Sequence, residues 1–181
     1  MEMSEQKEEH GYGLEGVAFG LADGIICFIG IIIGVAVATQ SVRLVVISGI
    51  IGGIADALGN SFGFFISQSA ERGVQISNVE EYGQELRVHS KKEVLMSAVL
   101  SFGATILALV FLIFPFLFLS IFPAVASTFL IGSLALFILG RYVAKMSRES
   151  TFKTGLKFAL LGISGAIVSY LVGDLLRYLL L

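Results

Sequence analysis

Five apolar segments dominate this chain of 181 residues, and each is long enough to cross a bilayer. A spanning helix needs about 20 mostly apolar residues. Only 14% of the residues are charged, whereas soluble domains contain about 25%. One soluble core of this size could not hide so much apolar surface. The sequence therefore predicts an all-α membrane protein with five transmembrane helices, over residues 14–39, 44–70, 93–118, 121–144 and 154–180.

Lysine and arginine are distributed unevenly between the two ends of these predicted helices. Loops rich in these residues stay on the cytoplasmic side of a membrane. Five spans place ten of the 12 basic residues on one side and only Arg43 and Arg177 on the other. The sequence therefore predicts a cytoplasmic N-terminus and an external C-terminus. Residues 1–10 are acidic, unlike a signal peptide, and we expect an integral, multi-pass protein of a prokaryotic plasma membrane.

The positions of the polar residues divide the chain into a tail and one transmembrane domain. We expect an acidic N-terminal tail over residues 1–13 and a single transmembrane domain over residues 14–181, with a short cytoplasmic polar segment at 71–93. The net charge is -2 and the chain has no strong basic patch, so nucleic acid is not expected as a partner. The single cysteine, Cys27, lies in an apolar run and is interpreted as a small buried hydrophobe.

Glycine is concentrated in the first two predicted helices, where several pairs stand four residues apart. Small residues at this spacing let helix backbones approach closely in lipid. Two interpretations stay open: tight packing within one chain, or contact with a second copy in a homodimer. The pairs are Gly20/Gly24, Gly30/Gly34, Gly49/Gly53 and Gly59/Gly63.

Two aspartates, Asp23 and Asp56, lie inside the first two apolar segments. A carboxylate in hydrocarbon costs at least about 2.5–3.5 kcal/mol, so it needs a partner, a cation or a proton. Counted from opposite faces, Asp23 lies roughly 14 Å and Asp56 roughly 18 Å deep at 1.5 Å per residue. The two depths add to about one hydrocarbon core of ~30 Å, so the carboxylates are expected at the same level. Each could hydrogen-bond to a neighbouring helix, but the pair favours a shared divalent cation or proton.

Further oxygen donors follow Asp56 along the second segment. Asn60 lies one turn away on the same face and is a candidate neutral ligand. Glu71, Glu81 and Glu85 could collect cations at the cytoplasmic end, although the basic residues around them also fit a solvated helical face. Hard oxygen ligands suit Mg²⁺, Mn²⁺, Ca²⁺ or Fe²⁺ better than copper(I).

Several motifs resemble the vacuolar iron transporter family, and the resemblance extends over all five spans. It implies a dimer whose metal path runs along the dimer interface, between the first two helices of each protomer. It also implies an antiporter that exports Fe²⁺ or Mn²⁺ from the cytosol in exchange for protons, with Asp23 as the family's first-helix aspartate. The motifs are Asp23-Gly24-Ile25-Ile26, Gly30, Gly34-Val35-Ala36, Ala57-Leu58 and Gly63-Phe64-Phe65-Ile66-Ser67.

The second segment departs from the family pattern. Gly52 stands at the position of the family's glutamate, Asn60 at that of its methionine, and Phe64 at the glutamate of its Gly-Glu-Tyr motif. Asp56 falls one turn from each of the first two positions. Methionine sulfur favours softer transition metals, so aspartate and asparagine here make the predicted site harder. The family's glutamate-rich cytosolic region is reduced to residues 71–93.

These observations predict a dimeric metal transporter rather than an enzyme, with no permanently bound cofactor. Its expected partners are lipid, protons, a second copy and the transported Fe²⁺ or Mn²⁺. Two alternatives are a non-transporting metal-binding membrane protein and an intramembrane aspartyl protease, which also needs two buried aspartates. The protease signature Gly-x-Gly-Asp is absent, because the nearest match, Leu171-Val172-Gly173-Asp174, lacks the first glycine.

Overall fold

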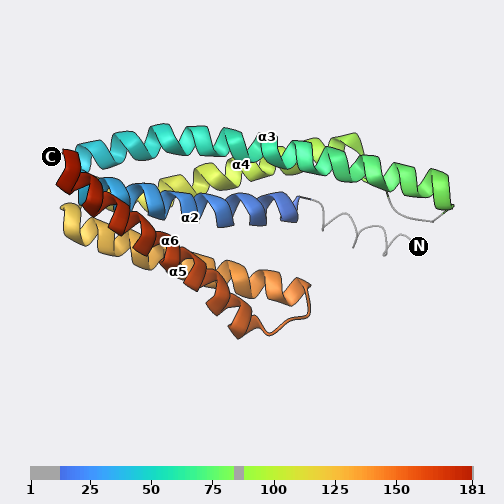
Figure 1. The fold of residues 1–181 in the computed structure, drawn as a ribbon. Helices are drawn as coiled ribbons and strands as arrows, with labels where there is room; N and C mark the ends of the chain where they lie inside the picture. The colour runs from blue at the N-terminus through green and yellow to red at the C-terminus, as the bar shows by residue number, and fades with distance from the viewer. Residues whose placement is uncertain (1–12, 84–87, 181) are drawn as a thin grey trace.

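A computed structural model describes residues 13–83 and 88–180, and every regular element in this part of the chain is helical (Figure 1). Five of the helices are long and apolar enough to cross a bilayer, which confirms the predicted five-helix membrane architecture. Glu85 and residues 1–12 of the predicted acidic tail lie outside the described residues. The elements are α2 (Leu14–Thr39), α3 (Val42–Tyr82), α4 (Lys91–Ile113), the 3₁₀ helix η1 (Phe114–Leu117), α5 (Ile121–Met146) and α6 (Thr151–Leu180).

Helix α3 is much longer than its apolar part. It has 41 residues, which span about 60 Å at 1.5 Å per residue, twice the ~30 Å hydrocarbon core. The polar segment after residue 70, predicted as a separate stretch, therefore begins as a continuation of the spanning helix. The helix ends at Gly83, whose φ of 59° is left-handed, a conformation that glycine adopts without steric strain.

Local sequence signals mark the other helix ends. The Ser41 side chain accepts a hydrogen bond from the Leu44 amide at the start of α3. Ser90 and Glu93 form a reciprocal capping box at the start of α4, which satisfies two amides that the helix itself leaves unpaired. Pro115 lies in η1, directly after α4, and Pro123 lies in the first turn of α5. Both prolines therefore lie at helix ends, where the missing amide proton costs no helical hydrogen bond.

Helix α2 is the centre of the bundle, with α3 and α4 on one side and α5 and α6 on the other (Figure 1). It contacts each of the other four long helices. Its close approach to α4 depends on glycine, because a Cβ on Gly16 or Gly20 would collide with the backbone of Ser97 or Ser101. The fully buried side chains of the core include Phe28, Ile29, Ile32, Leu112 and Leu136.

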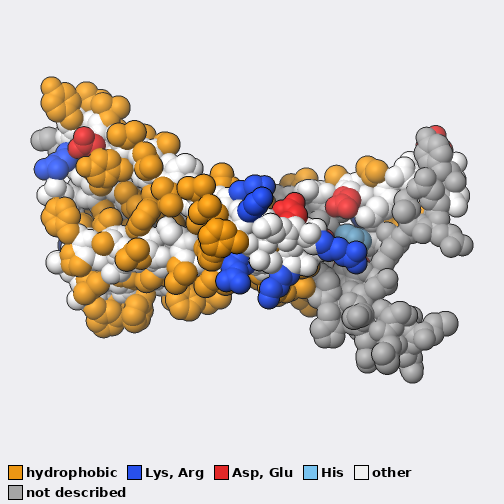
Figure 2. Space-filling view, turned by 90° about the horizontal axis from the view of Figure 1, so that it is seen from below, with side chains coloured by type: hydrophobic (Ala, Val, Ile, Leu, Met, Phe, Trp, Pro, Cys, Tyr) orange, Lys and Arg blue, Asp and Glu red, His pale blue; other side chains and the backbone are white. Residues whose placement is uncertain are grey.

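The surface changes character along the bundle. Figure 2 shows apolar side chains over one end of the molecule, and most of the lysine and arginine side chains in view gather where that surface ends. Many large apolar side chains on the outer faces are exposed, such as Phe62 and Leu130. An apolar surface of this extent fits contact with lipid rather than water. The protein is therefore an integral, multi-pass membrane protein.

Candidate functional site

Three ionisable side chains meet between α2 and α3. Asp23, Cys27 and Asp56 each offer one oxygen or sulfur atom, and these three atoms lie within 4.8 Å of one another. Asp23 and Cys27 are four residues apart and so share one face of α2; the Cys27 thiol lies 3.7 Å from Asp23 Oδ2 and donates to it. Among the described residues, no other three His, Cys, Asp or Glu side chains are close enough to share a metal ion.

Asp56 is held by a hydrogen-bond chain that begins on α4. The Thr105 hydroxyl lies 3.0 Å from the carbonyl oxygens of both Gly20 and Ser101, so its single proton points to the backbone. It must then accept from the Asn60 amide nitrogen, 3.4 Å away. The same NH₂ group donates to Asp56 Oδ2 at 3.3 Å. Asn60, predicted as an oxygen ligand, therefore faces Asp56 as a donor and orients its carboxylate.

The other predicted acidic residues lie away from this cluster. Glu71 is exposed on α3 and accepts a hydrogen bond from Gln75 at 3.4 Å. It is 15 residues beyond Asp56, or about 22 Å along the helix. Glu81 is exposed near the end of the same helix. The structure thus brings together Asp23 and Asp56 and leaves Glu71 and Glu81 on the polar extension of α3.

A second polar cluster lies where α2 begins. The buried Gln68 side chain donates to Glu15 Oε2 at 3.4 Å. Its amide oxygen lies 3.2 Å from Nδ1 of His89, whose carbonyl oxygen accepts from Arg72 Nε at 2.8 Å. Glu15 and His89 thus join α2 and α3 to the segment before α4.

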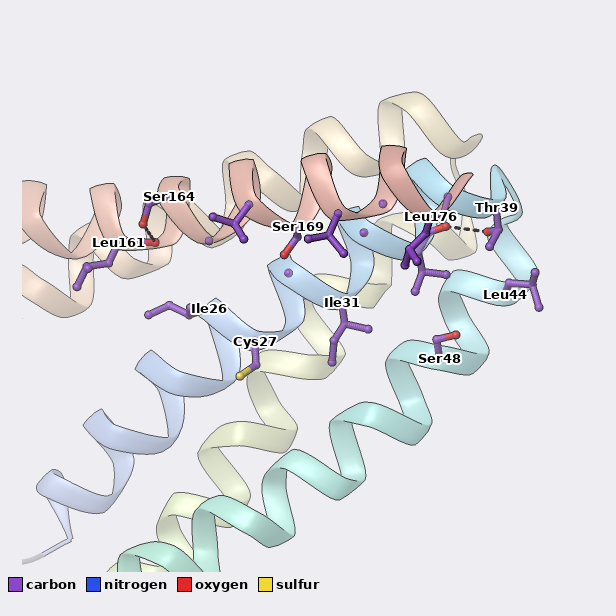
Figure 3. A pocket seen from close by; sticks show the side chains of 18 residues that line it. Ile26, Cys27, Ile31, Thr39, Leu44, Ser48, Leu161, Ser164, Ser169 and Leu176 are labelled. Carbon is purple, nitrogen blue, oxygen red and sulfur yellow. Dashed lines mark hydrogen bonds between the residues drawn. The ribbon is translucent and has the colours of Figure 1, made fainter. Parts of the chain in front are cut away.

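Cys27 is the member of the site that the sequence interpretation missed. Its position among isoleucines, glycine and phenylalanine is typical of a small buried hydrophobe. The available signal was its spacing from Asp23, one helical turn on the same face. Cys27 also stands at one end of an apolar groove of about 1070 Å³ between α2, α3 and α6. Figure 3 shows Cys27 and Ile26 at one end of this groove and Leu44 and Ser48 near the other.

The family model described as the VIT family matches residues 14–96, which include all of α2 and α3 and the first turns of α4. This part of the chain is similar to the VIT family. Both helices that carry the three-residue cluster lie within the match. An uncharacterized protein of Methanocaldococcus jannaschii is 24% identical over 169 residues, an alignment that covers 88% of each chain. The match to the VIT family supports a membrane transporter of metal ions.

Proposed function

We propose that this protein exports a divalent transition metal, Fe²⁺ or Mn²⁺, from the cytosol in exchange for protons. The observation that carries the proposal is the Asp23, Cys27 and Asp56 cluster inside the two apolar helices that match the VIT family. Carboxylates suit Mn²⁺ and Fe²⁺, and a thiolate adds affinity for the softer of these ions. A divalent cation would neutralise two carboxylates that lipid otherwise disfavours.

Competition between metal and protons would couple the two fluxes. The Asp23 and Asp56 carboxylates and the Cys27 thiol can each bind either a proton or a metal ion. Metal arriving from the cytosol would displace protons from these groups, and protons arriving from the other side would displace the metal. Asn60 would keep the Asp56 carboxylate oriented in both states, because its NH₂ group can donate to a protonated or an ionised carboxyl group.

The direction of transport follows from the orientation that we propose. The basic residues described in the structure lie mostly at the end where α2 begins, and the positive-inside rule assigns that end to the cytoplasm. A prokaryotic plasma membrane is the proposed location. These residues are Arg72, Lys91, Lys92, Arg141, Lys145, Arg148, Lys153 and Lys157.

A homodimer through α3 is part of the same proposal. Most glycines of α2 are used inside the protomer, since added Cβ atoms there would meet α4 or α6. Gly59 and Gly63 differ, because a Cβ on either would meet nothing within 4 Å. They are four residues apart on α3 and beside exposed Phe62 and Ile66. This small-residue surface is suited to close contact with a second helix in lipid.

Flux into liposomes tests the proposal. Purified protein should move Fe²⁺ or Mn²⁺ when a proton gradient is imposed, and Asp23→Asn should abolish the flux. Asp174→Asn is the matched control, since Asp174 is exposed near the end of α6 and outside the cluster. Metal binding without flux in the wild type would favour a non-transporting metal-binding protein. Equal flux in the wild type and Asp23→Asn would rule out the proposed role of Asp23.

Adjacent aspartates also characterise aspartyl proteases, in which two carboxylates share a proton. Here a thiol lies in the same cluster, and both helices match a transporter family. Both facts favour metal transport over peptide hydrolysis. Cleavage of a transmembrane reporter peptide that is lost in Asp56→Asn would reverse this preference.

A further inference from the structure

The contact between α2 and α3 is organised in layers one helical turn apart. The two helices are antiparallel, so positions 15, 19 and 23 on α2 face positions 68, 64 and 60 to 56 on α3. The first layer is the hydrogen bond between Gln68 and Glu15. The third contains Asp23, Cys27 and Asp56. Each step of four residues advances about 6 Å along a helix.

In the contact between α2 and α3, the middle layer consists of two aromatic rings. The rings of Phe19 and Phe64 have their centroids 5.3 Å apart with planes inclined at 37°, a normal geometry for an attractive aromatic pair. Phe64 is 9% exposed and lies between the helices, whereas Phe19 is 43% exposed. No polar side chain of α2 or α3 stands at this level of the contact. Two polar layers are therefore separated by one apolar layer.

An apolar layer of this kind opposes the passage of ions. Hydrophobic constrictions close a pathway because water leaves them, and an ion cannot cross without its hydration shell or replacement ligands. The rings offer neither. The cluster at Asp23 and Asp56 is thus shielded from the polar cluster at Glu15 and Gln68, although only about 12 Å of helix separates Asp23 from Glu15.

We propose that Phe19 and Phe64 form a hydrophobic gate between the metal cluster and the end of the bundle where α2 begins, and that the structure shows this gate closed. The inference rests on the proposed transport function, for which it supplies the cytoplasmic barrier. The gate opens when the two rings separate. The polar layer of Glu15, Gln68 and His89 then becomes continuous with the metal cluster.

Cys27 can report on this gate, because it is the only cysteine in the chain and belongs to the cluster with Asp23 and Asp56 on the far side of the rings from Glu15. The experiment measures the rate at which a charged, membrane-impermeant methanethiosulfonate reagent modifies Cys27 in metal-free membrane vesicles. The reagent is added separately from each side. From the side where α2 begins, the wild type should react slowly. Phe64→Ala should react at least about tenfold faster, which corresponds to a barrier lowered by about 1.4 kcal/mol.

Matched variants distinguish the loss of the aromatic layer from a general disturbance of the fold. Phe122→Ala removes an exposed ring at the start of α5, outside the contact between α2 and α3, and should leave the rate unchanged. Phe64→Leu keeps an apolar side chain in the layer and should stay slow. Phe19→Ala removes the more exposed ring and should also speed the reaction, which keeps the test valid if Phe64→Ala fails to fold.

Unchanged modification rates in both Phe64→Ala and Phe19→Ala would overturn the gate. An equal increase in Phe122→Ala would overturn it too, because the effect would then not depend on the aromatic layer. Modification requires no metal flux. A wild type that shows gated modification but moves no metal would therefore count against the proposed transport and in favour of the gate.

Discussion

Replacing Asp56 with asparagine removes one of the two negative charges in the cluster and preserves the shape of the side chain. It also keeps an oxygen that can accept from Asn60. Asp23 and Asp56 each place an oxygen within 4.8 Å of the other, and two unit charges at that distance repel by about 3.5 kcal/mol at an effective dielectric constant of 20. Without metal, Asp56→Asn should therefore raise the free energy of unfolding by up to about 3.5 kcal/mol.

Metal should offset much of this difference in the free energy of unfolding. At a concentration 100 times the wild-type Kd, a bound ion stabilises the protein by about 2.7 kcal/mol. If Asp56→Asn weakens binding about 100-fold, the same concentration equals its Kd and adds only about 0.4 kcal/mol. The metal should thus stabilise the wild type by about 2 kcal/mol more than the variant. In the proposed site, the charge that destabilises the metal-free protein is the charge that would bind the ion.

The assay is thermal unfolding of detergent-solubilised protein, followed as the fraction that stays monodisperse on size-exclusion chromatography. It is run at neutral pH with and without Mn²⁺. Asp174→Asn, outside the cluster, should behave as the wild type in both conditions. If Mn²⁺ stabilises Asp56→Asn as much as the wild type, Asp56 is not a ligand and the charge argument fails.

Three further substitutions test separate parts of the site. Cys27→Ser replaces sulfur with a harder oxygen and should lower the preference for Fe²⁺ over Mn²⁺ about tenfold, measured in competition flux assays. Thr105→Val removes the hydroxyl that accepts from Asn60 and should weaken Mn²⁺ binding by about 10-fold, as outer-shell changes do, with unchanged circular dichroism. Gly20→Leu would collide with the α4 backbone and should abolish the monodisperse peak, whereas Gly103→Leu, in open space, should not.

The sequence predicts the five helices well because the bilayer fixes the length of an apolar span. It does not predict where α3 ends. Hydropathy reports where apolar side chains stop, near residue 70, whereas backbone hydrogen bonding continues to Tyr82. The polar residues in between are compatible with a helix and contain no proline. Only Gly83, with its left-handed backbone, ends the helix.

The sequence also predicts only part of the candidate site, namely the depth of its residues in the membrane. Depth along a helix follows from residue count, so the sequence could place Asp23 and Asp56 at one level. The rotation of each helix about its axis does not follow from depth. For this reason the sequence did not predict that Cys27 faces the same point, or that Thr105 on α4 reaches Asn60.

The cluster also accounts for the departure of this chain from the family pattern. Asn60 stands where the family pattern has a methionine, and this difference suggests a site without sulfur. The structure places the Cys27 sulfur in the cluster from α2, the opposite helix. A donor set with one sulfur and two carboxylates is softer than the oxygen-only set that the sequence suggested. Because α2 supplies the sulfur, Asn60 is available to hydrogen-bond to Asp56, and through Thr105 it ties that carboxylate to the glycine-dependent contact between α2 and α4.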